Sequence, residues 1–171
     1  MSATKKEDNV RVSTAFNRLL RLQGAWVRGV RFAEEGIVCE VAPRRRRRIC
    51  SGCGKGGPRL AVHDRRRTRW RHLDLGAQRC FVECELRRVR CPACGVRYEA
   101  VPWARPGASH TRDFEDVVAF LAQQMAKTPI TRLMRVGWAT VGRIVERVVA
   151  EHLDETRLAG LVMIGVETVC A

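Results

Sequence analysis

The sequence contains no long hydrophobic run and no recognisable export signal. No apolar stretch approaches the ~20 residues that a membrane-spanning helix requires, and no apolar secretory segment opens the chain. We therefore expect a cytoplasmic protein in a reducing environment. In that setting the eight cysteines are expected to be metal ligands or buried thiols rather than partners in disulfides.

Acidic residues are scarce, and this gives the chain a strong positive charge. The 171 residues include 18 Asp and Glu against 32 Lys and Arg, a net charge of +14. Residues 1–112 hold 26 basic and 10 acidic side chains, whereas residues 113–171 hold 6 and 8. Such a charge attracts polyanions, so nucleic acid is the expected partner. The first part is predicted to contact phosphates broadly, and the second to use a few placed residues.

Four cysteines form two CxxC pairs, Cys50 with Cys53 and Cys91 with Cys94. Two thiolates on a tight turn can bind one ion, and two such turns complete a tetrahedron around a structural zinc. A glycine follows each pair and allows the backbone to turn beneath the sulfurs. The 37 residues between the pairs exceed the usual finger spacing, but a long hairpin accommodates them. Iron in the same cage, metal-free structural thiols and a redox pair are the alternatives.

The other cysteines and two histidines are not expected to bind this metal. Cys39, Cys80 and Cys84 alternate with apolar residues in predicted strands, a pattern typical of small buried side chains. Because four thiolates already complete the site, His63 and His72 are interpreted as surface or core residues.

Hydrophobic periodicity divides the chain into a strand-rich part and a helical part. Alternation predicts a hairpin over 25–44 and strands over 59–75 and 79–90, whereas a helical period begins at Asp113. A short helix is predicted over 13–24. The predicted fold class is α+β, with a flexible N-terminus (1–12), a small zinc-ribbon-like β-rich domain (13–100), a linker (101–112), an all-α helix-turn-helix domain (113–155) and a final segment (156–171).

Arginine runs flank the first CxxC pair and lie between the two pairs. A guanidinium group can donate two hydrogen bonds to phosphate oxygens, and each phosphate that it neutralises releases counterions. These side chains are therefore predicted to hold a nucleic-acid backbone without reading its base sequence. The alternative is that these arginines form a solvated basic face that only keeps the domain soluble. Trp70, within one run, fits a core position better than a base-stacking one. The candidate side chains are Arg44, Arg45, Arg46, Arg47, Arg48, Arg65, Arg66, Arg67 and Arg69.

Three helices with a short break before the third match a helix-turn-helix. Thr128 is predicted to cap the second helix. In the third helix, predicted over 140–153, Thr140, Arg143 and Arg147 share the side opposite the apolar stripe. That position suits base reading from the major groove. A three-helix bundle used only for packing or dimerisation would show a similar pattern.

Several strings in the chain resemble the N-terminal half of insertion-sequence transposases of the ISL3 family. They are VHDRRRTRWRHLDLG, CPACGVRYEAVPWARPGASHTRDFEDVVAFLAQQMAKT and WATVGRIVERVV. The resemblance covers residues 16–166. It implies a zinc-binding domain, a helix-turn-helix and then an RNase-H-like catalytic domain. It places the zinc ligands at Cys50, Cys53, Cys91 and Cys94 and the DNA-reading helix at 139–150, with terminal inverted repeats of double-stranded DNA as the partner.

The end of the sequence departs from that family pattern. The family's first catalytic strand typically reads GVDE, and its aspartate binds magnesium. Here the matching position is Glu167 in LVMIGVETVCA. Strand transfer needs several carboxylates holding two metal ions. The chain is therefore expected to be a truncated, non-enzymatic DNA-binding fragment without catalytic residues. The alternative is a zinc-stabilised interaction or regulatory module that binds nucleic acid non-specifically. A homodimer and an association with the nucleoid are compatible with either reading.

Overall fold

The computed structural model describes residues 11–44, 47–57 and 60–152. They belong to two compact units, one ending at Glu115 and the other beginning at Asp116. Strands dominate the first unit and helices form the second, so the predicted succession of a β-rich part and a helical part is confirmed. Residues 1–10 of the predicted flexible N-terminus, Arg45, Arg46 and the segment around Glu167 lie outside the described residues. The predicted boundary at residue 12 is wrong, because Val12 is already the first residue of a helix.

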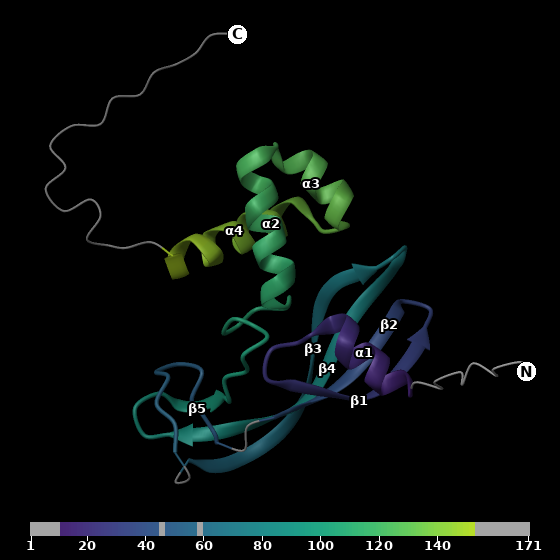
Figure 1. Ribbon diagram of the computed structural model, residues 1–171. Coiled ribbons are helices and arrows are strands. Elements are labelled where there is room, and N and C mark those ends of the chain that lie inside the picture. Colours follow the sequence, from purple (N-terminus) through teal and green to yellow (C-terminus); the bar gives the residue numbers. More distant parts are fainter. Residues whose placement is uncertain (1–10, 45–46, 58–59, 153–171) are drawn as a thin grey trace, which may run out of the picture. The chain divides into compact units, whose positions relative to one another are not determined.

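The first unit is a five-stranded sheet built from two hairpins. The hairpins join through a parallel pairing of β2 with β4, which gives the order β1-β2-β4-β3, and β5 pairs antiparallel with the far end of β4 (Figure 1). The predicted hairpin over 25–44 is thus present, and the strands predicted over 59–75 and 79–90 pair as a second hairpin. The strands are β1 (Ala25–Ala33), β2 (Gly36–Pro43), β3 (Ala61–Leu75), β4 (Gln78–Cys91) and β5 (Gly95–Tyr98).

A short helix, α1 (Val12–Leu20), precedes the sheet and packs on β1. The sequence predicted its end at Gly24, but the helix ends four residues earlier because Arg21 takes a left-handed conformation with φ of 46°. Asn17 fixes the helix to β1: its Oδ1 accepts from the Val27 amide at 2.9 Å, and its Nδ2 donates to the Val27 carbonyl at 3.3 Å.

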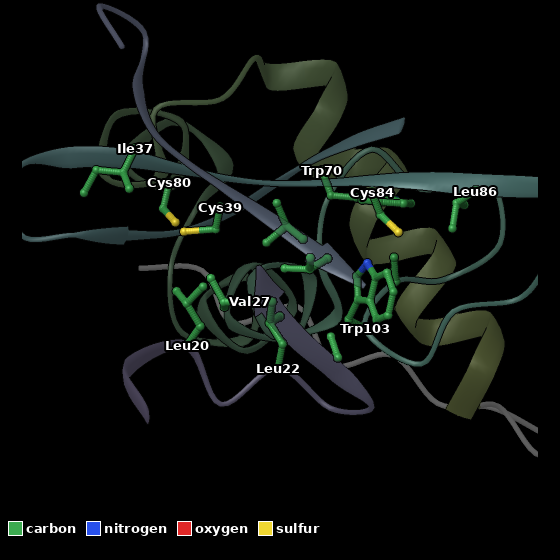
Figure 2. Close-up of a cluster of buried hydrophobic side chains, with 14 residues drawn as sticks. Leu20, Leu22, Val27, Ile37, Cys39, Trp70, Cys80, Cys84, Leu86 and Trp103 are labelled. Atoms are coloured by element: carbon green, nitrogen blue, oxygen red, sulfur yellow. The ribbon is translucent and has the colours of Figure 1, made fainter. Parts of the chain in front are cut away.

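One face of the sheet carries the hydrophobic core of the first unit (Figure 2). Cys39, Cys80 and Cys84 are buried there, as their alternation predicted. Trp70 is 3% exposed and meets Trp103 edge-to-face with ring centroids 5.9 Å apart, so its predicted core position is also confirmed. This packing gives the sheet a rigid base from which its other side chains project.

Residues 101–112, predicted as a linker, pack against the first unit. Trp103 enters the core, and the amide of Thr111 donates to the Arg71 carbonyl at 2.9 Å. His72 and Thr111 share a hydrogen bond of 2.9 Å between Nδ1 and Oγ1. Burial lowers the pKa of His72 below its ordinary value, which favours the neutral ring. His72 is therefore a core residue, as predicted.

The helical unit contains α3 (Lys127–Met134), α4 (Trp138–His152) and most of α2 (Arg112–Gln124). The prediction that Thr128 caps α3 is wrong, because Ala126 occupies the N-cap and Thr128 lies inside the first turn. None of the described helices is long and apolar enough to cross a membrane. Apolar side chains of the three helices form the interior of this unit, and they include Val118, Ile130, Val141, Ile144 and Val148.

Candidate metal centre and nucleic-acid interface

Main-chain pairing brings the two CxxC turns together at the far end of the sheet. The first turn lies between β2 and β3, and the second joins β4 to β5. The amide of Ser51 donates to the Tyr98 carbonyl at 3.1 Å, and the amide of Ala100 donates to the Ile49 carbonyl at 2.7 Å. The first turn is thereby tied to the strand that follows the second turn, although 37 residues separate the pairs in sequence.

The four sulfurs lie at distances that suit one tetrahedral metal ion. All lie within 4.8 Å of one another, and the sulfurs of Cys53 and Cys91 are 3.6 Å apart. Zinc–sulfur bonds of about 2.3 Å in a tetrahedron place sulfurs about 3.8 Å apart. All four cysteines are free thiols, so the arrangement fits a structural zinc better than a disulfide or a lone redox pair.

The backbone around Cys91 favours its thiolate form. Hydrogen bonds from the amides of Ala93 and Cys94 lower the pKa of Cys91 to about 7. The amide of Gly52 donates to the Cys50 sulfur at 3.4 Å. The glycines after the two pairs adopt left-handed conformations, with φ of 68° at Gly54 and 72° at Gly95. The predicted role of these glycines in the turns is confirmed.

Four protein thiolates would fill the coordination sphere of a zinc ion. Such a closed site leaves no position for water or substrate, so its contribution is to hold the fold rather than to catalyse a reaction. His63 and His72 are not members of the metal-binding cluster among the described residues. The ion would fasten β4, β5 and the first turn to one another.

The described residues of the first arginine run contact the protein itself. The Arg44 guanidinium stacks 3.8 Å from the ring centroid of Trp26, and its Nε donates to the Ala25 carbonyl at 2.9 Å. Arg47 donates to the Gly56 carbonyl at 3.1 Å, and Arg48 donates to the Leu60 carbonyl. These contacts hold the loop around the first CxxC turn, and they leave the outer faces of Arg44 and Arg47 exposed.

The second arginine run lies on the sheet face opposite the core, where it meets glutamates. Glu83 is 5% exposed and pairs with Arg69 at 2.6 Å, Arg31 at 2.8 Å and Arg67 at 3.8 Å. Arg65 pairs with Glu85 at 3.4 Å. Arg66 points to the other face, where Asp64 lies 3.6 Å away. The sequence predicted phosphate contacts for these arginines without anticipating their carboxylate partners.

Glu83 is predicted to stabilise the first unit. Burial alone would raise its pKa, but hydrogen bonds from Arg31 and Arg69 hold the pKa below its ordinary value of 4.5. Its stabilisation is therefore present above that value and lost on acidification. We expect Glu83→Gln to lower the free energy of unfolding by about 1.5–3 kcal/mol in urea titrations at neutral pH. The exposed neighbour Glu85 provides the control, since Glu85→Gln should cost under about 0.5 kcal/mol. Equal losses would contradict the role of Glu83.

Of the three predicted base-reading residues on helix α4, one is exposed to solvent. Arg143 is exposed, whereas Thr140 and Arg147 are half-buried. The guanidinium of Arg143 donates to the Thr140 hydroxyl at 3.4 Å. Val141 and Ile144 point into the unit, so Arg143 lies on the outer side of the helix close to its start.

Two residues near the start of α4 were not singled out from the sequence. Trp138, the first residue of α4, is 60% exposed, and Lys127 lies with Nζ 4.2 Å from the centroid of its ring. A cation above an aromatic face is an attractive arrangement. The sequence pattern places Trp138 in the break before the third predicted helix, whereas in the structure it is the first residue of α4, the helix that corresponds to the recognition helix of a helix-turn-helix.

Comparison with known proteins agrees with both parts of this arrangement. The zinc-finger of transposase IS204/IS1001/IS1096/IS1165 matches residues 46–94, and the helix-turn-helix domain of transposase family ISL3 matches residues 99–149. The transposase for insertion sequence element IS1557 of Mycobacterium tuberculosis is 41% identical over 138 residues, in strains CDC 1551 and H37Rv alike. The chain belongs to the ISL3 transposase family. No solved structure gave a significant match.

The family assignment rests on two neighbouring regions of the chain, residues 46–94 and 99–149. The alignment with the mycobacterial transposases covers 78% of this chain but 30% of their length. The zinc-finger match contains all four cysteines of the metal centre, and the helix-turn-helix match contains Arg143 and Trp138. In this ISL3 chain, zinc is the structural cofactor that the cysteine set fits.

Proposed function

We propose that this ISL3 chain recognises the terminal inverted repeats of an insertion sequence as double-stranded DNA. The observation that carries the proposal is the helix pair α3 and α4 within a matched transposase helix-turn-helix, with Arg143 exposed at the start of the second helix. In a helix-turn-helix, this part of the second helix contacts base edges in the major groove. We assign the described residues to DNA binding and not to DNA cleavage or strand transfer. The chain would bind chromosomal DNA in the cytoplasm.

The roles of individual residues follow from their positions. Arg143 is proposed to read a base, since a guanidinium can donate two hydrogen bonds to the major-groove edge of guanine. Thr140, which accepts a hydrogen bond from Arg143, would orient that side chain, and Arg147 would lie further along the same helix. The first unit would contribute affinity through phosphate contacts, and Cys50, Cys53, Cys91 and Cys94 would hold it together around zinc.

A second candidate function is non-specific binding of nucleic acid by a zinc-stabilised regulatory module. The concentration of basic side chains in residues 1–112 favours it, because phosphate contacts alone give affinity without sequence preference. Such a module would still occupy an element's ends and obstruct another transposase there. The two functions differ in whether the chain selects a sequence.

Selection from a random-sequence duplex library tests this difference. The zinc-loaded chain is expected to enrich one sequence, and that sequence should occur at both ends of an insertion element in inverted orientation. The bound duplexes are then compared with an unselected duplex of the same length at fixed salt. Binding without any enrichment would support the non-specific module instead.

Arg143→Ala is expected to reduce the preference for the selected duplex by about 1–3 kcal/mol, measured by fluorescence anisotropy against the unselected duplex. The matched control is Arg132→Ala, which removes the same charge from α3. This control should weaken binding to both duplexes by the same factor, because a phosphate contact does not distinguish base sequences. A loss of discrimination in Arg132→Ala that equals the loss in Arg143→Ala would contradict the assignment of base reading to Arg143.

A further inference from the structure

The positive charge of the first unit is divided between two surfaces with different electrostatic character. One is the sheet face opposite the core. The other is the far end of the β3–β4–β5 ribbon, around the two CxxC turns. Both are rich in arginine in the sequence, and the structure distinguishes them by where the carboxylates lie. The inference below rests on the proposed binding of DNA.

Arginines on the first surface are already matched by carboxylates. On this glutamate-paired face, Arg67 lies 3.5 Å from Glu40 and Arg69 lies 3.2 Å from Glu35, in addition to their pairing with Glu83. Cross-strand register explains the pairing, because Arg67 and Arg69 of β3 lie directly opposite acidic residues of β4. The full set is Arg31, Arg65, Arg67 and Arg69 with Glu35, Glu40, Glu83 and Glu85.

A phosphate that approached this face would meet the glutamates as well. Glu40 and Glu85 are 46% and 62% exposed, so their charges act on an incoming strand. An arginine that turned to a phosphate would leave its carboxylate without a partner, and the gain from the new contact would be offset by the loss of the old one. The glutamate-paired face is thus a poor site for counterion release.

The second surface carries cations with little compensation. We call it the ribbon end and define it by Arg47, Arg48, Lys55, Arg66, Arg88, Arg90 and Arg97. Asp64 neutralises part of this charge through Arg66 and Arg88, and Glu99 is held by Arg87 at 2.7 Å in the interior. Within the part of the chain that the structure describes, no carboxylate lies within 4.0 Å of Arg47, Lys55, Arg90 or Arg97.

The fold places these cations around the metal centre. Arg90 precedes the ligand Cys91 and lies opposite Val96 of β5, while Arg97 of β5 lies opposite Val89. Lys55 belongs to the first turn, where its carbonyl accepts from the Cys50 amide at 2.9 Å. Arg90, Arg97 and Lys55 are all exposed. A zinc ion bound by four thiolates carries two net negative charges. The seven cations of the ribbon end outnumber those two charges and the charge of Asp64 combined.

We propose that the ribbon end, rather than the glutamate-paired face, is the surface of the first unit that contacts DNA phosphates. The major groove of B-DNA is wide enough to admit a β-ribbon, and a backbone contact there releases counterions for each phosphate neutralised. Tyr98, 42% exposed beside Arg88 in the β4–β5 register, adds a flat ring to the same surface. The sequence-predicted contacts at Arg65, Arg67 and Arg69 are reassigned to holding the sheet face.

Two charge-matched double variants test this assignment. Arg90→Gln with Arg97→Gln removes two charges from the ribbon end, and Arg65→Gln with Arg67→Gln removes two from the glutamate-paired face. Binding of each full-length, zinc-loaded chain to a random-sequence 30-base-pair duplex is measured from 50 to 300 mM KCl. The slope of log Kobs against log salt is expected to become shallower by about 1.8 for the ribbon-end variant. The control variant should change it by less than about 0.5.

The outcomes separate the inference from the proposed function. Equal slopes for the two variants, or a larger change in the control, would overturn the assignment of the ribbon end. A wild-type chain that fails to bind any duplex at 50 mM KCl would instead overturn the proposed DNA binding itself. Zinc content and far-UV circular dichroism identify any variant that has lost its fold. In that case Arg90→Lys with Arg97→Lys, which keeps both charges, should retain the wild-type slope, and a shallower slope would contradict the charge argument.

Discussion

Replacing Cys91 with serine is expected to lower the zinc affinity of the chain by more than about 100-fold, because even groups that only support a metal ligand change affinity by 10- to 100-fold. Cys91 ends β4 and lies 3.6 Å from Cys53 across the site. Its amide contacts favour the thiolate, and serine has no comparable anionic form at neutral pH. Zinc per chain is measured by mass spectrometry of the native protein after dialysis.

The loss of metal is also expected to disorder the ribbon end while the sheet core persists. Structural zinc contributes about 10–16 kcal/mol of apparent binding free energy in small zinc domains, and that energy is coupled to folding. Hydrogen exchange should therefore accelerate at β5 and at the end of β4 but not at the buried centre of β4. Cys84→Ala is the matched control: it removes a buried thiol that lies outside the cysteine cluster and should keep one zinc per chain. Full zinc content in Cys91→Ser would contradict the four-cysteine site.

The second large effect is expected at a buried ion pair. Glu115 is fully buried, and Arg105, 4% exposed, donates to it at 3.3 Å. Removal of the Glu115 carboxylate takes away an opposite charge 3.3 Å from the Arg105 guanidinium in a low-dielectric interior. We expect Glu115→Gln to lower the free energy of unfolding by about 3–5 kcal/mol, a large part of the about 5–15 kcal/mol typical of a domain. Urea denaturation at saturating zinc measures it, following the first unit by Trp fluorescence.

A paired substitution shows whether the charge itself causes this loss. Changing both partners, Arg105→Met with Glu115→Leu, replaces the ion pair with apolar side chains of similar size. Such replacements are often neutral or stabilising, so the double variant should lie within about 1 kcal/mol of the wild-type chain. Two outcomes would show that Glu115 does not act through the ion pair: a Glu115→Gln chain as stable as the wild type, or a double variant less stable than Glu115→Gln.

Local patterns in the sequence predicted most of the helices and strands and singled out the four cysteines that cluster in the structure. The spacing of Cys50, Cys53, Cys91 and Cys94 indicates the geometry directly, because two cysteines two residues apart and followed by glycine lie on one tight turn. Alternation likewise determined the two hairpins and the buried positions of Cys39 and Trp70. These features depend on residues close together in the chain, where side-chain periodicity is a direct signal.

Features that depend on distant residues could not be predicted in this way. The arginine run of β3 was interpreted as a free phosphate-binding surface, because its acidic partners lie on β4, on β2 and in the β1–β2 turn. Only the strand register brings these charges together. The segment 101–112 was interpreted as a linker from its prolines, yet Trp103 packs in the core.

The central position of β4 has a consequence for the order in which the chain assembles during synthesis. β4 pairs with β2, β3 and β5. Among the strands that the structure describes, the β1–β2 hairpin is therefore the one pairing that can form before residues 78–91 have left the ribosome. The same residues deliver Cys91, the third cysteine of the metal cluster. Non-local pairings of this kind form slowly and leave strand edges open in the meantime. During that interval the nascent hairpin exposes the edge of β2, and the late arrival of one strand both covers that edge and begins the closure of the zinc site.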